Sequence, residues 1–159
     1  MALIWGLDLS LRSTGIVVLE EGKVIDAVTI RTKPKVRGPA RWTEILEGIA
    51  VVYEVARPDL AVLEGIAYGS HTACLSAELS ALVRYYLYKH EIAYKMVAPG
   101  TLKKITSSKG NANKKQMAEA VKRRWHLEFE DDHQVDAFCL AKLESMDRFS
   151  TIGIHDWRP

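Results

Sequence analysis

Residues 3–19, LIWGLDLSLRSTGIVVL, decide the fold of this chain. They predict two strands joined by a polar turn, with Asp8 inside the apolar first strand. Because strand side chains alternate between faces, Asp8 shares its face with the small residues Gly6 and Ser10. Burying a carboxylate is costly unless something pairs with it, so this face predicts a metal or substrate site. A lone strand aspartate is more often solvated at a sheet edge, so the prediction requires other acids to reach the same place.

The rest of the chain predicts a third strand and then alternating helices and strands. The Glu21-Gly22 pair is a hairpin turn, so the first three strands form an antiparallel meander. The later strands are separated by helical patterns, which predicts parallel pairing through crossover helices. The fold class is therefore α/β, with one mixed five-stranded sheet flanked by helices. The expected segments are strands over 23–31, 60–63 and 92–97, helices over 39–56, 71–89, 114–125 and 132–146, and a polar loop over 99–113.

Length and composition predict a single globular domain. The chain has 159 residues, which suits one domain over 1–159 with residues 149–159 as a C-terminal tail. No apolar run reaches about 18 residues, and the N-terminus lacks a basic start and a cleavage site, so neither a membrane span nor a signal peptide is expected. Cys74 and Cys139 fall in apolar helical patterns and are expected to be reduced core thiols. A cytosolic protein is therefore the expectation.

Basic residues cluster in two segments of a chain whose net charge is only +2. The segment 95–124 contains nine lysines and arginines against the single acid Glu119, and the segment 31–41 contains five and no acid. Such blocks are typical of a surface that faces a polyanion. A solvated surface that keeps the protein soluble is about equally compatible with the charge pattern alone.

The helix predicted over 71–89 has two apolar stripes. A surface helix of a monomer needs one stripe, so the second predicts burial against another copy of the chain. An overlying loop or the C-terminal tail is the alternative. The first stripe holds Leu75, Leu79, Leu82, Val83 and Tyr86, and the second holds Cys74, Ala77, Ala81, Tyr85 and Tyr88.

Further acids follow on elements that should lie beside Asp8. Glu64 ends the fourth strand, which is a natural neighbour of the first in this strand order, and strand carboxyl ends are the usual ligand sites. The last helix then opens with Asp132, His133 and Asp136, whose spacing directs the His133–Asp136 and Asp132–Asp136 pairs to one side. Oxygen ligands with one imidazole suit Mg²⁺ or Mn²⁺, and two such ions are the usual machinery for phosphodiester hydrolysis.

Simpler roles compete for some of these residues. Asp131 is more often a helix N-cap than a ligand, and Asp132 is open to the same interpretation. A lone His133 would more often be a surface histidine. Asp136 lies one turn into a helix whose next residues are apolar, so a purely structural role is harder to assign to it.

At this point the chain resembles a RuvC-type Holliday-junction resolvase of the RNase H-like superfamily, with features of its phage members. The matching segments cover nearly the whole chain in the family's order: GLDLSLRSTGIVVLE, VLEGIAYG, APGTLKKITSSKGNANKKQM and DDHQVDAFCLAKL. The resemblance places the family's acidic ligands on Asp8, Glu64 and Asp136, and the position that can be histidine on His133. Asp132 remains an alternative for that fourth ligand.

The resemblance implies an RNase H-like fold and a homodimeric endonuclease that uses two Mg²⁺ or Mn²⁺ ions per site. Such an enzyme resolves four-way DNA junctions by paired nicks that leave 5′-phosphates, and the resemblance implies that it does so in the cytoplasm of a bacterial or phage-infected bacterial cell. Two family lysines fall on Lys103 and Lys114, of which Lys114 is the expected catalytic cation. Where the family commonly has an aromatic residue three after the glutamate, this chain has Ala67, so the wedge is expected at Tyr68. The remaining DNA contacts are expected at Lys104, Lys109, Lys115 and Arg37.

Three other functions fit parts of the pattern. An RNase H-fold nuclease could act on other branched DNA or on an RNA–DNA hybrid. A non-catalytic junction-binding module would need none of the four ligands. An actin-like nucleotide-binding fold also starts with a strand aspartate and a polar turn, but it needs a duplicated domain for which 159 residues leave no room.

Overall fold

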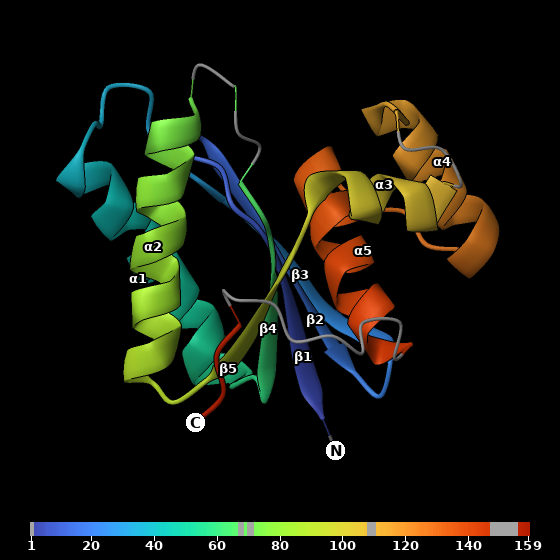
Figure 1. The fold of residues 1–159 in the computed structure, drawn as a ribbon, viewed down its shortest axis with the longest axis horizontal. Coiled ribbons are helices and arrows are strands. Elements are labelled where there is room, and N and C mark those ends of the chain that lie inside the picture. The colour runs from blue at the N-terminus through green and yellow to red at the C-terminus, as the bar shows by residue number, and fades with distance from the viewer. Residues whose placement is uncertain (1, 67–68, 70–71, 108–110, 147–155) are drawn as a thin grey trace.

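The protein is described by a computed structural model that covers residues 2–66, 69, 72–107, 111–146 and 156–159 (Figure 1). Its strands are β1 (Leu3–Asp8), β2 (Ser13–Glu20), β3 (Lys23–Arg31), β4 (Leu60–Glu64) and β5 (Ala93–Val97). Its helices are α1 (Pro39–Val55), α2 (Ala73–Lys89), α3 (Pro99–Ser107), α4 (Lys114–Trp125) and α5 (Asp132–Ser145).

The strands form one five-stranded sheet in the order β3-β2-β1-β4-β5. β1, β2 and β3 are antiparallel neighbours, whereas β4 pairs parallel with β1 and β5 parallel with β4. The predicted mixed sheet is therefore confirmed. The register places Leu7 opposite Leu63. Asp8 and Glu64 are the next residues on these two strands, so they lie beside each other at the same end of the sheet.

Helices cover both faces of the sheet, and each face has its own apolar core (Figure 1). α5 lies across one face with α3 and α4 beside it, and α1 and α2 lie on the other (Figure 1). Alternation along β1 sends Trp5 and Leu7 toward α1 and α2, where the Trp5 indole donates to the Ala56 carbonyl at 2.9 Å. Asp8 is thereby directed to the α5 side, as its place in the strand predicts.

Glycines on β1 and β2 allow α5 to lie almost against the sheet backbone. A Cβ on Gly6 would stand 1.8 Å from the Ala137 carbonyl oxygen, and one on Gly15 would stand 2.3 Å from that of His133. Gly15 lies within β2, and its backbone is not in the positive-φ region. Its role is close approach, which fixes the first turn of α5 beside the end of β1.

Two expectations are corrected by the structure, and a third stays a prediction. The segment expected as a polar loop contains α3, which Leu102 anchors because its side chain is buried in the α5-side core. Cys139 is buried as predicted, but Cys74 is exposed. On the second stripe of α2, Tyr85 is 62% exposed and Tyr88 is 51% exposed among the described residues, although the Tyr88 ring also contacts Trp157 of the C-terminal tail. Burial of this stripe against another copy of the chain therefore stays a prediction.

The C-terminal residues cover part of the β5 edge. Trp157 and Tyr94 exchange two backbone hydrogen bonds, and Asp156 accepts from the Met96 amide. The contact satisfies groups that an edge strand would otherwise leave open to pairing with another chain. Among the helices that the structure describes, none has the length and apolar character required to cross a membrane.

Candidate active site

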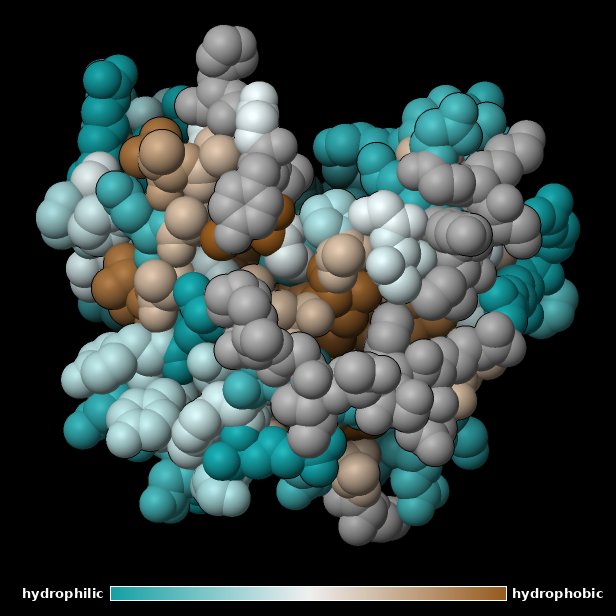
Figure 2. Space-filling model, in the orientation of Figure 1, coloured by the Kyte–Doolittle hydropathy of each residue, from teal (hydrophilic) through white to brown (hydrophobic). Residues whose placement is uncertain are grey.

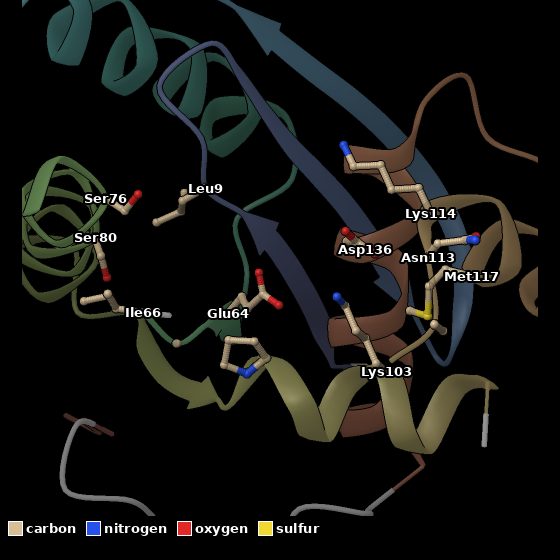
Figure 3. Close-up of a pocket in the computed structure, with 13 residues that line it drawn as sticks. Leu9, Glu64, Ile66, Ser76, Ser80, Lys103, Asn113, Lys114, Met117 and Asp136 are labelled. Carbon is tan, nitrogen blue, oxygen red and sulfur yellow. The ribbon is translucent and has the colours of Figure 1, made fainter. Parts of the chain in front are cut away.

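A cleft of about 450 Å³ opens at the end of the sheet where the carboxyl ends of β1 and β4 lie. Figure 2 shows a hollow in the surface at this end of the sheet, between the α2 side and the α3–α4 side. In Figure 3, Glu64 points into the cleft from β4 and Asp136 from α5, while Lys103 reaches toward both carboxylates from α3. The opposite wall belongs to α2, which contributes Ser76 and Ser80. The cleft thus joins groups far apart in the sequence.

His133 is joined directly to Asp8. Its Nδ1 lies 2.7 Å from the Asp8 carboxylate, and the two side chains are largely shielded from solvent. A carboxylate only accepts, so Nδ1 carries the proton of this hydrogen bond. The hydrogen bond to Asp8 raises the pKa of His133, against a smaller lowering by burial. With Nδ1 engaged, Nε2 of the neutral ring remains an available ligand atom.

The neighbouring acids at the start of α5 have other partners. Asp131 caps the helix by accepting from the Gln134 amide at 3.0 Å, and it also accepts from Thr29 and Arg31. Its interpretation as an N-cap is therefore supported by the geometry. Asp132 forms an ion pair with Lys114 of α4, so it is turned toward that helix while His133 is turned toward Asp8.

Burial and mutual repulsion make two of the carboxyl groups difficult to ionise. Burial, then the charges of Asp8 and Asp136, raises the pKa of Glu64 to about 7, against a smaller lowering by Lys103. Burial, then Asp8 and Asp132, raises the pKa of Asp136 to about 6. Repelling acids in a cleft are typical of a functional site, because a stable core would not assemble them.

The donor set suits a hard divalent cation. Carboxylate oxygens from Asp8, Glu64 and Asp136, with one imidazole nitrogen from His133, are ligands that Mg²⁺ and Mn²⁺ accept, and a cation would relieve the repulsion that raises the carboxyl pKa values. Within the described ranges, no three His, Cys, Asp or Glu side chains are grouped tightly enough for metal binding as they stand. The chemistry of the donor set fits such a cation, and its members come from β1, β4 and α5.

A capping box that the sequence patterns above did not include positions Lys114 at this cleft. The Asn113 side chain accepts from the Gln116 amide at 2.9 Å, and the Gln116 side chain accepts from the Asn113 amide at 3.0 Å. The signal was readable as Asn113-x-x-Gln116 before a helical pattern. It starts α4 at Lys114, whose side chain lines the cleft (Figure 3).

The predicted DNA contacts are distributed unevenly. Lys103 lines the cleft, while Lys115 and Arg37 are exposed on α4 and in the segment before α1. Teal, hydrophilic side chains gather over the α4 region in Figure 2. Tyr68, Lys109 and the side chain of Lys104 lie outside the described residues.

Residues 4–143 match the family model described as "Crossover junction endodeoxyribonuclease RuvC". This match spans nearly all of the sheet and of the five helices. The chain belongs to the RuvC family. The assignment agrees with the enzyme class that the sequence motifs predicted.

Relatives with this description include the crossover junction endodeoxyribonuclease RuvC of Treponema pallidum, from the Nichols strain and from a second strain. Each is 26% identical over 149 residues, which cover 89% of this chain and 76% of the relative. The length of the match supports a shared fold throughout the described sheet.

Solved structures of junction resolvases have the same fold. Thermus thermophilus RuvC in complex with a Holliday junction substrate superposes with a TM-score of 0.77 at 18% identity, covering 96% of this chain and 98% of that chain. The fowlpox virus Holliday junction resolvase superposes with a TM-score of 0.62 at 11% identity, covering 92% and 99%. At these identities the similarity shows a shared fold. The role of each side chain is argued from the geometry of the cleft.

Proposed function

We propose that this RuvC-family chain is a metal-dependent, structure-selective endonuclease that resolves four-way DNA junctions by paired symmetric nicks. The observation that carries the proposal is that Glu64 and Asp136 line one cleft together with Lys103 and Lys114. His133 is hydrogen-bonded to Asp8, whose charge raises the pKa of both cleft acids. Residues 1–159 would form a single nuclease domain. Acids that repel one another beside cations suit a site for metal ions and a phosphodiester.

The four ligands would hold two Mg²⁺ or Mn²⁺ ions, which supply the charge that activates a water molecule and stabilises the leaving oxygen. The protein's own contribution is to hold these ligands on rigid elements. Asp8 and Glu64 lie at the ends of the paired strands β1 and β4, and α5 is pressed onto β1 and β2 through Gly6 and Gly15. His133 keeps the Asp8 carboxylate oriented through Nδ1. The expected products are 5′-phosphate and 3′-hydroxyl ends.

The cations around the cleft would bind the DNA backbone. Lys114 is 73% exposed at its side chain and belongs to the cleft wall, where it would stabilise charge on the scissile phosphate. Lys103, Lys115 and Arg37 would contact phosphates of the arms without reading sequence. Lys104 and Lys109 of the basic segment, and Tyr68 next to the family's wedge position, complete the proposed DNA-binding set.

A homodimer would place two such clefts on the two-fold symmetric junction. The surface proposed for it is the exposed apolar side of α2, which carries Leu75, Tyr85 and Tyr88. In Figure 2, brown and tan hydrophobic side chains are exposed over α2. Two sites in one particle account for paired nicks without two independent binding events.

The decisive experiment uses a fixed four-way junction, incubated with and without Mg²⁺ or Mn²⁺, with nicks mapped on all four strands. Symmetric nicks that require metal are the expected result. A flap and an RNA–DNA hybrid are cut in parallel, and faster cutting of either would assign the cleft to that substrate instead. Absence of metal-dependent nicking on any of them would favour a non-catalytic binding module.

Ligand variants test which residues carry the reaction. Asp8→Asn and Asp136→Asn should bind the junction as wild type does while losing cutting on the order of 10³-fold, since metal stabilisation is worth several kcal/mol. Asp131→Asn is the matched control, because asparagine caps a helix as well as aspartate and should leave the rate within a few-fold. Full cutting by Asp8→Asn or Asp136→Asn at ordinary Mg²⁺ concentration would refute the ligand assignment.

A further inference from the structure

The first turn of α4 concentrates positive charge. Lys114 and Lys115 are its first two residues, and the turn contains no acid. The amino end of a helix already carries a partial positive charge, so cations there are disfavoured and an anion is favoured. Without DNA, this end of α4 therefore requires an anionic partner from the protein itself.

Asp132 provides that partner. It is the first residue of α5, a position where a carboxylate interacts favourably with the helix dipole, and it forms an ion pair with Lys114. The pair therefore joins the amino ends of two helices. The ion pair lies between two hollows of the surface. Lys114 lines both the catalytic cleft and a second groove of about 460 Å³, and Asp132 lines the second groove.

We propose that Asp132 is a positioning residue, which holds the Lys114 ammonium at the cleft rim before DNA arrives. The inference rests on the proposed function, because it concerns the cation expected to meet the scissile phosphate. A free lysine samples many rotamers, and a partner on rigid α5 restricts them to those that keep the charge beside the acids. The hydrogen bond that Lys114 donates to Asp132 raises the pKa of Lys114, with smaller contributions from Asp136 and Asp8 in the same direction.

This assignment separates Asp132 from its neighbour His133. Successive helix residues project about 100° apart, and the two side chains contact different partners, Lys114 and Asp8 respectively. Asp132 would thus act on the reaction through a lysine, whereas His133 belongs to the proposed ligand set. The two roles predict different dependences on metal concentration.

The test is a double-mutant cycle measured by single-turnover cutting of a fixed four-way junction, with junction affinity measured separately without added metal. Asp132→Asn should slow cutting about fivefold, the upper range for a single exposed ion pair, and leave affinity within about twofold. In a Lys114→Gln background, Asp132→Asn should have no further effect on the rate. With Lys114 intact, Asp132→Glu should cut at close to the wild-type rate, because it keeps a carboxylate partner for the lysine.

Two further readouts make the result specific. The Mg²⁺ concentration for half-maximal cutting should be the same in Asp132→Asn as in wild type, whereas loss of a ligand would raise it. Glu128→Gln is the matched control, because it breaks another ion pair of α4, with Lys122, away from the catalytic cleft. It should cut at the wild-type rate.

Several results would overturn the inference while leaving the proposed function intact. These are a wild-type or faster rate for Asp132→Asn, an equal slowing in the Lys114→Gln background, or a raised Mg²⁺ requirement, which would make Asp132 a ligand. Failure of the wild-type protein to cut any branched DNA would overturn the proposed function and this inference together.

Discussion

The two faces of the sheet are built in different ways. On one face, α5 is buried along nearly its whole length and touches the strands through backbone atoms at Gly6 and Gly15. On the other, α1 and α2 each bury one side and leave apolar side chains such as Val55 and Tyr85 exposed. Rigid backbone contact thus supports the proposed ligands, and one-sided packing leaves exposed the surface proposed for a partner.

The largest effect should come from adding one methyl group on the α5 face. Gly6→Ala would place a Cβ 1.8 Å from the Ala137 carbonyl oxygen, a backbone atom that cannot move without shifting α5. We expect a loss of about 3 kcal/mol or more in the free energy of unfolding, at the upper end for overpacked cores. Urea unfolding monitored by circular dichroism measures it.

Gly48→Ala is the corresponding change on the α1 face. Its Cβ would meet three side-chain atoms of Ile30 at 2.8–2.9 Å, so this branched side chain must shift, whereas alanine is the better helix former by about 1 kcal/mol. Gly48→Ala should therefore destabilise the protein less than Gly6→Ala, because a side chain moves rather than a helix backbone. Equal destabilisation by Gly6→Ala and Gly48→Ala would contradict the proposed difference between the faces.

The acids of the cleft should make the metal-free protein less stable as pH rises. The pKa of Glu64 is raised from 4.5 to about 7, so its protonated form is favoured in the folded state. The contribution of this protonated carboxyl group to the free energy of unfolding is fully present below pH 4.5 and is lost as pH rises through about 7. Its upper limit is about 3 kcal/mol. Glu64→Gln should therefore be more stable than wild type at pH 8 in EDTA.

Unfolding at pH 5 and pH 8 measures this prediction, with Glu78→Gln as the control because Glu78 lies on α2, away from the acids of the cleft. Glu78→Gln should follow the wild-type pH dependence. Saturating Mg²⁺ should stabilise the wild-type protein more than Glu64→Gln, because bound ligand stabilises the state that holds it. An unchanged pH dependence in Glu64→Gln would show that this carboxyl group is not the one that burial and repulsion affect.

The strands and α5 were predictable because their patterns are local and strong. Alternation in residues 3–19 placed Asp8 on its face correctly, and the spacing of His133 and Asp136 gave their common direction. α3 was missed because Pro99, Gly100 and the following threonines and serines resemble a loop, and its helix depends on Leu102 reaching the core. Tertiary burial overrode local propensity there.

The partners of the first acids in α5 were less predictable than their positions. Sequence spacing could not choose between Asp132 and His133 as the fourth ligand, because both lie in the same helical turn. The choice depends on where α4 lies, since Lys114 approaches Asp132 from that helix. A contact between segments whose relative position is set by the core is not encoded in local periodicity.

The exposed side of α2 should respond to charge through assembly rather than stability. Tyr85→Glu should shift the protein from dimer to monomer in sedimentation at micromolar concentration, with little change in unfolding, because Tyr85 is 62% exposed within one chain. Ile25→Glu on β3, where the native side chain is 50% exposed, is the control and should not alter sedimentation. A monomeric wild-type protein that cuts junctions would refute the dimer proposal.

The smallest effect is expected from a single cation beyond the cleft. Arg37 is exposed in the basic segment before α1, so Arg37→Ala should weaken junction binding a few-fold and reduce the salt dependence by about one unit of slope. Arg57→Ala removes the same charge near the other end of α1, where Arg57 stacks on Tyr53 and donates to the His90 carbonyl. It should leave the slope unchanged. Equal losses of slope for both variants would mean that binding follows net charge, and the basic segment would then have no special part in holding the arms.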